Sequence, residues 1–227
     1  MSGTSAKKIQ IVVGAKAGKV SGLLTRSAGA RALLVLAHGA GAGMGHKFMD
    51  ETAAKLAEHG IATLRYQFPY MQKGIKRPDS ETLLTDTVRA AVAAAKKLAG
   101  ALPLFAGGKS MGGRMTSLAA AKERLDGVRG LIFFGFPLHA AGKPGAERGA
   151  HLAAVDLPML FLQGSRDTLA DLTLLRPLCR KLGDRAELFV IEGGDHSFHM
   201  LKSSGRADDQ VLREAVKKAA EWIVERR

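Results

Sequence analysis

A serine between two glycines is the first residue in this sequence whose surroundings indicate chemistry. Ser110 stands in Gly108-Lys109-Ser110-Met111-Gly112, a Gly-x-Ser-x-Gly pattern. An apolar stretch expected to be a strand precedes it, and a helix-forming stretch follows it. At such a turn, Gly108 and Gly112 avoid collisions with neighbouring chain while the strained backbone exposes the hydroxyl between them. The pattern alone is weak, but in this context it predicts a nucleophile at Ser110.

Two other interpretations of this segment stay open as weaker alternatives. One is a tight turn with a purely structural role. The other is a phosphate-binding loop, because Gly108-Lys109-Ser110 has the right order of residues. The first glycine of that loop motif would fall on Pro103, which lacks the required backbone freedom. The nucleophile is therefore the preferred interpretation.

A serine nucleophile needs a base and an acid that orients the base, and both follow later in the chain. Asp167 comes after the apolar stretch Met159 to Leu162, and His196 comes after Leu188 to Ile191. Each therefore occupies a loop at the end of an expected strand. Ser, Asp and His in this order is the order found in α/β-hydrolases. The sequence predicts Ser110, Asp167 and His196 as a catalytic triad.

Other acids and histidines could compete for these roles. Asp171 lies a turn further on and is expected to be solvated or near a helix N-terminus, and Asp195 is expected to shape the loop of His196. His199 is the alternative base, but it lies nearer the next helix. The remaining histidines outside the glycine-rich loops are interpreted as surface or packed residues: His59, His139 and His151.

Acyl transfer also needs hydrogen-bond donors directed at the developing oxyanion. The apolar stretch Leu33 to Ala37 leads into His38-Gly39-Ala40-Gly41-Ala42-Gly43-Met44-Gly45. A histidine-glycine loop of this type can offer a backbone N–H beside the nucleophile. The amides of Ala40 and Met111 are the predicted donors, and His38 is expected to anchor the loop. A flexible turn without this role is the alternative.

The elements that must position these residues can be read from the hydrophobic pattern. Nearly continuous apolar runs predict buried strands, and three- and four-residue periodicity predicts helices between them. The strands are expected at Leu33 to Ala37, Ile61 to Tyr66, Leu102 to Ala106, Leu131 to Phe136, Met159 to Leu162 and Leu188 to Ile191. The helices are expected at Lys47 to His59, Ser80 to Leu98, Met111 to Leu125, Leu172 to Leu182 and Ala207 to Val224, with Ser80 as an N-cap. This alternation predicts an open parallel sheet with right-handed crossovers.

An antiparallel hairpin is expected at one edge of that sheet. Ile9 to Val13 and Val20 to Leu24 flank the glycine-bearing segment Gly14 to Gly18. No repeat or long linker divides the sequence, so residues 1–227 are expected to form a single domain.

With these motifs in place, the sequence resembles the α/β-hydrolase superfamily from the hairpin at Ile9 to the final helix. The segments Gly108 to Arg114, Leu64 to Tyr70 and Gly194 to Phe198 are similar to the KANL3/Tex30-type, dienelactone-hydrolase-like branch. The resemblance implies an α/β-hydrolase fold: a mostly parallel central sheet with an N-terminal antiparallel hairpin and helices on both faces. It also implies Ser110, Asp167 and His196 as the triad. Dienelactone hydrolases use a cysteine nucleophile, so the serine here departs from that activity.

The size of the substrate is bounded by the segment Pro137 to Pro158, where larger relatives insert a helical lid. This segment is too short for a substantial lid, which favours an open cleft for small or extended acyl esters. Phe68, Tyr70 and Phe198 are possible walls of a substrate pocket, or plain packing residues. Lys109 and Arg114 flank the nucleophile and either favour anionic substrates or pair with nearby acids.

Composition excludes several classes of protein. The single cysteine, Cys179, excludes an intrachain disulfide and a cysteine-based zinc site, and no metal or cofactor is expected. The segment Met1 to Gln10 is polar, and no apolar run approaches the roughly 18 residues of a spanning helix. The sequence therefore predicts a cytoplasmic protein with neither a signal peptide nor a membrane segment, either a monomer or a homodimer.

The net charge of +13 raises the question of nucleic acid. The basic residues near the start, such as Lys7, Lys16 and Arg31, are spread through strand and turn patterns rather than along one helical stripe. No specific nucleic-acid partner is expected. The preferred function is therefore a serine hydrolase acting on small carboxylic esters. The alternatives are a noncatalytic interaction module on a hydrolase fold and a basic polyanion-binding protein.

Overall fold

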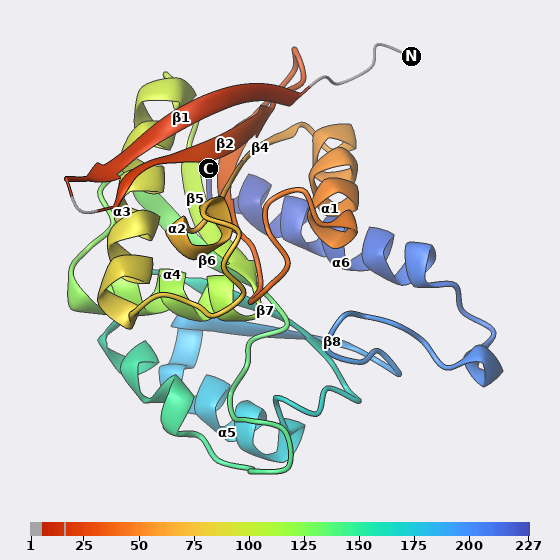
Figure 1. Cartoon of the computed structure of the whole chain (residues 1–227). Helices are drawn as coiled ribbons and strands as arrows, with labels where there is room; N and C mark the ends of the chain where they lie inside the picture. Colours follow the sequence, from red (N-terminus) through yellow and green to blue (C-terminus); the bar gives the residue numbers. More distant parts are fainter. Residues whose placement is uncertain (1–5, 16) are drawn as a thin grey trace.

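An eight-stranded sheet forms the centre of the fold in the computed structural model (Figure 1), which describes residues 6–15 and 17–227. The first residues of the expected polar N-terminus and Lys16 in the expected hairpin turn lie outside the described residues. The strands are β1 (Ala6–Gly14), β2 (Gly18–Thr25), β3 (Ala32–Ala37), β4 (Ile61–Tyr66), β5 (Leu104–Lys109), β6 (Val128–Phe134), β7 (Met159–Gly164) and β8 (Ala186–Ile191).

The strand order across the sheet is β1-β2-β4-β3-β5-β6-β7-β8. β1 pairs with β2, and β2 with β4, in antiparallel fashion, whereas all the remaining pairs are parallel. The sheet is thus mostly parallel with an N-terminal hairpin at one edge, as the sequence predicts. Because β3 and β5 to β8 are parallel, their carboxyl ends lie at one edge of the sheet.

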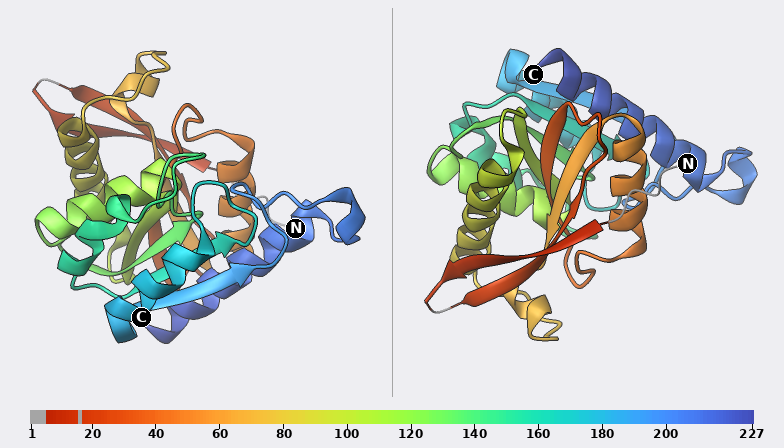
Figure 2. Two further views of the ribbon diagram at one scale, coloured as in Figure 1. Left: turned by 90° about the horizontal axis from the view of Figure 1, so that it is seen from below. Right: turned by 90° about the horizontal axis from the view of Figure 1, so that it is seen from above.

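Helices cover both faces of this sheet, as Figure 2 shows. α1 (Lys47–Glu58) and α6 (Asp208–Glu225) pack on one face, and α3 (Glu81–Ala99), α4 (Met111–Lys122) and α5 (Leu172–Leu182) pack on the other. The side chains of β3 alternate between these layers: Leu33 and Val35 join the core under α3, whereas Leu34 and Leu36 join the core under α1. Burial on both faces explains why the strands are apolar almost without interruption.

The long helix α3 shows how the local sequence specifies an element. Ser80 caps its N-terminus, since its hydroxyl oxygen accepts a hydrogen bond from the amide of Leu83 at 3.4 Å. The residues that recur every three or four positions, including Leu84, Val88 and Ala91, are buried against the sheet. Both features are as predicted.

Glycines account for two strand ends that differ from the prediction. β5 continues past Ala106 through Gly107 and Gly108, two glycines that the hydrophobic pattern does not mark as strand residues. Glycine is needed there because the neighbouring chain is too close for a side chain: a Cβ on Gly107 would lie 1.9 Å from the carbonyl oxygen of Ile132. β6 ends at Phe134, because Gly135 turns the backbone with a φ of 70°.

Four short helical elements were not predicted. They are the four-residue helix α2 (Pro69–Gln72) and the 3₁₀ helices η1 (Glu147–Ala154), η2 (Gly183–Arg185) and η3 (Lys202–Ser204). Within the segment expected to be too short for a lid, the structure has η1 and one isolated bridge between Ala140 and Lys143, and no substantial lid is built there. None of the helices in residues 6–15 and 17–227 is long and apolar enough to cross a membrane.

Candidate active site

Ser110 lies in the sharp turn between β5 and α4. Its backbone has a φ of 52° and a ψ of −120°, a strained conformation that costs a non-glycine residue on the order of 1–3 kcal/mol. A Cβ on either Gly108 or Gly112 would lie 2.5 Å from the carbonyl oxygen of Ala37. These two positions therefore exclude any side chain, because β3 passes too close to the turn. The predicted elbow glycines thus stand where the backbone requires them.

His196 and Asp167 meet Ser110 at the carboxyl edge of the sheet, after β8 and β7. His196 Nε2 lies 2.8 Å from Ser110 Oγ, and His196 Nδ1 lies 2.7 Å from Asp167 Oδ2. Because a carboxylate only accepts hydrogen bonds, Nδ1 carries the proton, and Nε2 is left to accept one from the serine hydroxyl. The three predicted residues therefore form one hydrogen-bonded chain, the arrangement in which an imidazole can take the proton of a serine nucleophile.

The carboxylate of Asp167 is completely buried, since none of its side chain is exposed. Besides the contact with His196, its Oδ1 accepts a hydrogen bond from the amide of Leu169 at 2.8 Å. Its Oδ2 also accepts one from Gln163 Nε2. These donors satisfy a charge that would otherwise be costly to bury, and they fix the plane of the carboxylate.

Gln163 is a residue of this site that the sequence reasoning missed. Its side chain is buried, and its Oε1 accepts a hydrogen bond from the amide of Phe136 at 2.8 Å. With one end held by an N–H and the other by a carboxylate, the orientation of the amide is fully determined. The signal in the sequence is a polar residue at the end of the otherwise apolar run Met159-Leu160-Phe161-Leu162.

His38 anchors the glycine-rich loop that follows β3. Its Nδ1 donates a hydrogen bond to the carbonyl of Gly39 at 2.7 Å, and its Nε2 accepts one from the amide of Phe68 at 3.2 Å. Burial lowers the pKa of His38 from 6.5 to about 4, so the ring is neutral at pH 7. The side chain therefore serves to hold the loop, in agreement with the role expected for it.

Three further side chains, all from β4 and the segment after it, hold the same loop. The hydroxyl of Tyr70 accepts a hydrogen bond from the amide of Gly41 at 3.1 Å. Gln67 Oε1 accepts one from the amide of Met44 at 2.8 Å, and the Arg65 guanidinium donates one to the Met44 carbonyl at 3.1 Å. These hydrogen bonds hold the loop in place despite its many glycines.

The amides predicted to bind an oxyanion lie on this loop and on α4. Within the described part of the chain, neither the N–H of Ala40 nor that of Met111 has an acceptor. A Cβ on Gly39 would lie 3.7 Å from the Cβ of Ser110, so the loop runs alongside the serine. Both amides are therefore free to donate near Ser110, and their role in stabilising an oxyanion stays a prediction.

The aromatic residues considered as walls of a substrate pocket are core residues in this structure. Phe68, Tyr70 and Phe198 are exposed by no more than 1%. Phe68 contacts the rings of His38 and Tyr66 edge to face and stacks on the ring of Tyr70. The hydroxyl of Tyr70 holds the glycine-rich loop. They face the interior because they pack beneath the loops that carry the site. The alternative that the sequence left open, plain packing, describes them better.

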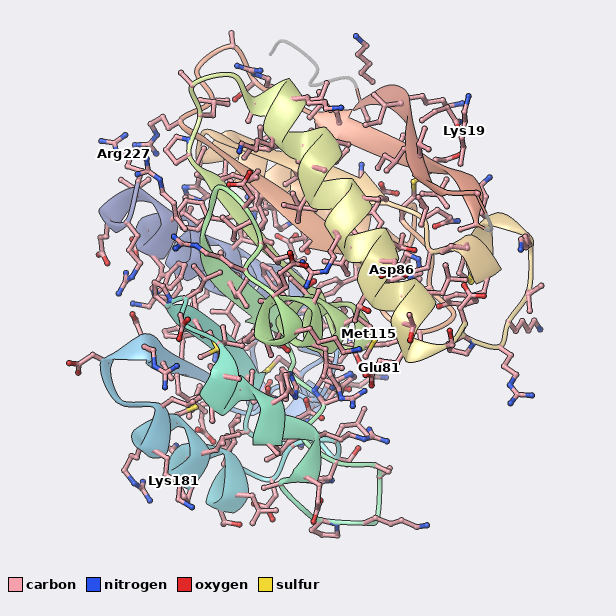
Figure 3. The ribbon with its side chains drawn as sticks, turned by 90° about the vertical axis from the view of Figure 1, so that its left-hand side faces the viewer. Lys19, Glu81, Asp86, Met115, Lys181 and Arg227 are labelled. Atoms are coloured by element: carbon pink, nitrogen blue, oxygen red, sulfur yellow. The ribbon has the colours of Figure 1, made fainter. Side chains whose placement is uncertain are left out.

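The two basic residues beside Ser110 differ in their surroundings. The ammonium of Lys109 is buried and donates to the carbonyl of His196, so it does not face an incoming substrate. Arg114 is 26% exposed, and its guanidinium lies 3.8 Å from Glu81 at the start of α3, the residue labelled in Figure 3. For Arg114 the structure therefore shows the expected pairing with an acid.

The competing acids and histidines have other partners. Asp171 caps α5 by accepting the amide of the second residue of that helix at 2.8 Å. Asp195 accepts the amides of Ser197 and His199 at 2.7 and 2.9 Å, so it shapes the loop of the base. His199 is exposed and pairs with Asp208 at 2.7 Å. Across residues 6–15 and 17–227, no group of three or more His, Cys, Asp or Glu side chains is arranged to hold a metal ion.

Comparison with known proteins places this geometry in a family context. Residues 30–224 match the family described as the alpha/beta hydrolase domain. Among solved structures, a dienelactone hydrolase from Anabaena variabilis shares 21% identity with a TM-score of 0.74, over 98% of this chain and 99% of that one. An alpha-beta serine hydrolase homologue from Coxiella burnetii shares 18% identity with a TM-score of 0.72, over 99% of both chains. A lidless α/β serine hydrolase from Xanthomonas campestris shares 20% identity with a TM-score of 0.69, over 96% of both chains. These similarities confirm the predicted fold class.

Proposed function

This chain belongs to the alpha/beta hydrolase domain family, and on that premise we propose that it is a serine hydrolase that cleaves small carboxylic esters through an acyl-enzyme. The observation that carries the proposal is the hydrogen-bonded chain from Ser110 through His196 to Asp167. A scaffold that only binds a partner has no physical need for a strained serine in contact with a neutral acceptor nitrogen.

The proposed acylation begins with the hydroxyl of Ser110. Its Oγ attacks the ester carbonyl carbon while the proton passes to His196 Nε2. The carbonyl oxygen becomes an oxyanion, which the amides of Ala40 and Met111 stabilise. When this intermediate collapses, the imidazolium gives its proton to the leaving oxygen, the alcohol departs, and the acyl group stays on Ser110.

Water completes the cycle by the same route. His196 Nε2 takes a proton from a water molecule, which attacks the acyl carbon, and the returned proton restores the Ser110 hydroxyl as the carboxylic acid leaves. The positive charge that appears on the imidazole in both steps faces the fully buried carboxylate of Asp167. In that water-poor surrounding the attraction is stronger than it is in bulk water.

Small or extended acyl groups are the proposed substrates because little chain is available to cover the site. The segment after β6 holds η1 and no larger element over its described residues. An open site suits a short acyl chain better than a long one that needs an enclosing apolar tunnel. The motifs around Ser110 and His196 also support our assignment to the KANL3/Tex30-type, dienelactone-hydrolase-like branch.

The test is covalent labelling with a fluorophosphonate, followed by peptide mapping. We expect the label on Ser110 and its loss in Ser110→Ala, with turnover of p-nitrophenyl acetate reduced by on the order of 10⁶. Ser117→Ala, which alters another serine of α4, is the matched control and should still label. Wild-type protein that does not label, or Ser110→Ala protein that keeps full activity, contradicts the proposal.

The acyl preference is tested with p-nitrophenyl esters of increasing chain length. We expect kcat/KM to be highest for short chains and to fall with length, because little apolar surface is available to bury a long chain. A steady rise toward long acyl chains contradicts the assignment to small esters. Salt-sensitive retention on heparin without any esterase activity supports the polyanion-binding alternative instead.

A further inference from the structure

A buried ammonium group lies directly behind the proposed catalytic base. The Lys109 side chain, at the end of β5, is only 8% exposed, and its Nζ donates a hydrogen bond to the carbonyl oxygen of His196. The rings of Phe48 and Phe198 flank the ammonium at 5.6 and 5.9 Å from their centroids. Within the described residues no carboxylate lies within 4.0 Å of it. An ammonium is costly to bury in such surroundings, and its hydrogen bond to the carbonyl of His196 offsets part of that cost.

The backbone leaves room for the contact between Lys109 and His196. Gly135, just after β6, has a φ of 70°, and a Cβ there would lie 3.0 Å from both Lys109 Nζ and the His196 carbonyl oxygen. In the part of the chain that the structure describes, Lys109 is the one donor found for this carbonyl. The ammonium therefore gives the backbone of the base a hydrogen bond from the end of β5, the strand that leads into the nucleophile.

The same ammonium balances the charge of the triad. Burial lowers the pKa of Lys109 from 10.5 to about 8, and the negative charges of Asp167 and Asp195 oppose that effect. The charged form therefore predominates at pH 7. The buried carboxylate of Asp167 then has a nearby positive charge that does not come from the imidazole.

We infer that Lys109 is a positioning residue for the catalytic base: its ammonium holds the backbone of His196 so that the imidazole stays between Ser110 and Asp167. The inference rests on the proposed function, because it concerns the base of that reaction. A lysine on the solvent side of the site would act on the substrate. Lys109 instead acts through His196, and its loss should slow the chemical step without weakening substrate binding.

The test compares two buried lysines. Lys109→Met removes the ammonium at the site, whereas Lys55→Met removes an equally buried ammonium that pairs with Asp209 at 2.6 Å between α1 and α6. We expect Lys109→Met to lower the maximal rate of fluorophosphonate labelling about 10²-fold, the size of effect that a displaced catalytic group produces, with the apparent affinity for the probe unchanged. Lys55→Met should lose stability but label at the wild-type rate.

A spectroscopic signal separates positioning from general destabilisation. The proton between His196 Nδ1 and Asp167 should give a far-downfield NMR resonance in the wild type and in Lys55→Met. In Lys109→Met we expect it to shift or broaden because the imidazole is no longer held. An unchanged resonance together with a wild-type labelling rate overturns the inference.

A second variant keeps the inference testable where Lys109→Met does not fold. Lys109→Gln keeps a hydrogen-bond donor and removes the charge, so we expect a smaller loss of labelling rate than in Lys109→Met. A wild-type labelling rate together with an unchanged NMR resonance in Lys109→Gln overturns the inference. The proposed function is judged separately, by labelling of the wild type at Ser110. If the wild type is labelled at Ser110 and the Lys109 variants are labelled at the wild-type rate, only the role of Lys109 is rejected and the proposed function stands.

Discussion

The buried carboxylate of Asp167 explains why polar side chains gather beneath the proposed catalytic serine. A carboxylate with none of its surface exposed is stable only if donors surround it, and here the amide of Leu169, the side chain of Gln163 and the ring of His196 provide them. Gln163 also links this network to the segment after β6, since it accepts the amide of Phe136. The orientation of the base therefore depends on residues that never meet the substrate.

Replacing Gln163 tests this dependence. Gln163→Met preserves the side-chain volume but leaves the amide of Phe136 without its acceptor and Asp167 without one donor, so we expect the free energy of unfolding to fall by about 1–3 kcal/mol. We also expect kcat for p-nitrophenyl acetate to fall about 10-fold or more while KM stays the same, because the acid–base pair loses its fixed orientation. Steady-state kinetics and urea denaturation measure the two effects.

A glutamine away from the site supplies the control for that experiment. Gln72 accepts the amide of Ser21 at 2.8 Å on the exposed side of the hairpin, so Gln72→Met should leave kcat unchanged. Wild-type kcat in Gln163→Met contradicts the positioning role of Gln163.

The lowered pKa of His38 makes the free energy of unfolding depend on pH. Its pKa is about 4 in the folded protein and 6.5 in an ordinary environment, so between these values the unfolded chain binds the extra proton. Burial of the neutral ring therefore contributes to the free energy of unfolding in a pH-dependent way. This contribution is fully present above pH 6.5, amounts to about 3 kcal/mol, and is lost as the pH falls through about 4. Burial lowers the pKa of His151 to about 4 in the same way, so both histidines act in one direction.

Urea denaturation between pH 7.5 and 4.5 measures this effect. We expect the free energy of unfolding of the wild type to decrease across that range, and to decrease less steeply in His38→Asn, which lacks the titrating ring but keeps His151. His38→Asn should also be less stable at pH 7.5, because it loses one of the hydrogen bonds to Gly39 and Phe68. Equal slopes for the two proteins contradict the assignment.

At the scale of the element, the sequence predicts the regular parts well and the irregular ones poorly. The apolar strands and amphipathic helices follow from burial patterns, and the turn at Ser110 follows from the glycines that β3 makes obligatory. The side chains that hold the glycine-rich loop do not follow. Arg65 and Gln67 contact that loop across distances of about 20 residues, and nothing in the local pattern reveals such a tertiary partner.

The same limit explains the reassignment of the aromatic residues. Whether Tyr70 faces a cleft or the interior depends on where the loop after β3 lies, which hydrophobicity alone does not specify. In the structure its hydroxyl meets the amide of Gly41, and its ring lies against those of His38 and Phe68. The placement of the triad residues was predictable because strand ends converge by topology, whereas the placement of Tyr70 depends on packing.

A pair of tyrosines tests the importance of loop position. Tyr70→Phe removes the acceptor of the Gly41 amide, one residue from the predicted donor Ala40, so we expect kcat to fall about 10-fold as the amide loses its alignment. Tyr66→Phe is the matched control, because within the described residues the buried Tyr66 hydroxyl has no hydrogen-bond partner. Its removal should leave kcat unchanged and keep or raise the free energy of unfolding. Equal kcat values for the two variants contradict the role of Tyr70.

On the scale of the whole molecule, the parallel sheet brings distant segments of chain together. β5, β7 and β8 each end at the same edge, so the loops that follow them meet although Ser110 and His196 are 86 positions apart. In an open parallel sheet, the loops at the carboxyl ends of the strands are where ligands usually bind. The site lies at this edge.

The net charge of +13 gives the last prediction, which concerns how substrate reaches that edge. The labelled basic side chains Lys19, Lys181 and Arg227 lie in separate parts of the surface (Figure 3), so the positive charge is not confined to one place. The field of this charge accelerates the approach of anions and is screened by salt within a Debye length of roughly 10 Å at 0.1 M.

We therefore expect kcat/KM for an ester that carries a carboxylate, such as a p-nitrophenyl hemisuccinate, to fall several-fold between about 10 and 300 mM NaCl. For neutral p-nitrophenyl acetate, kcat/KM should change little over the same range, because no charge is steered. kcat should be insensitive to salt for both esters, since the approach of substrate does not affect the chemical step. Parallel salt dependence of the two esters contradicts steering by net charge and indicates instead that salt acts on the enzyme itself.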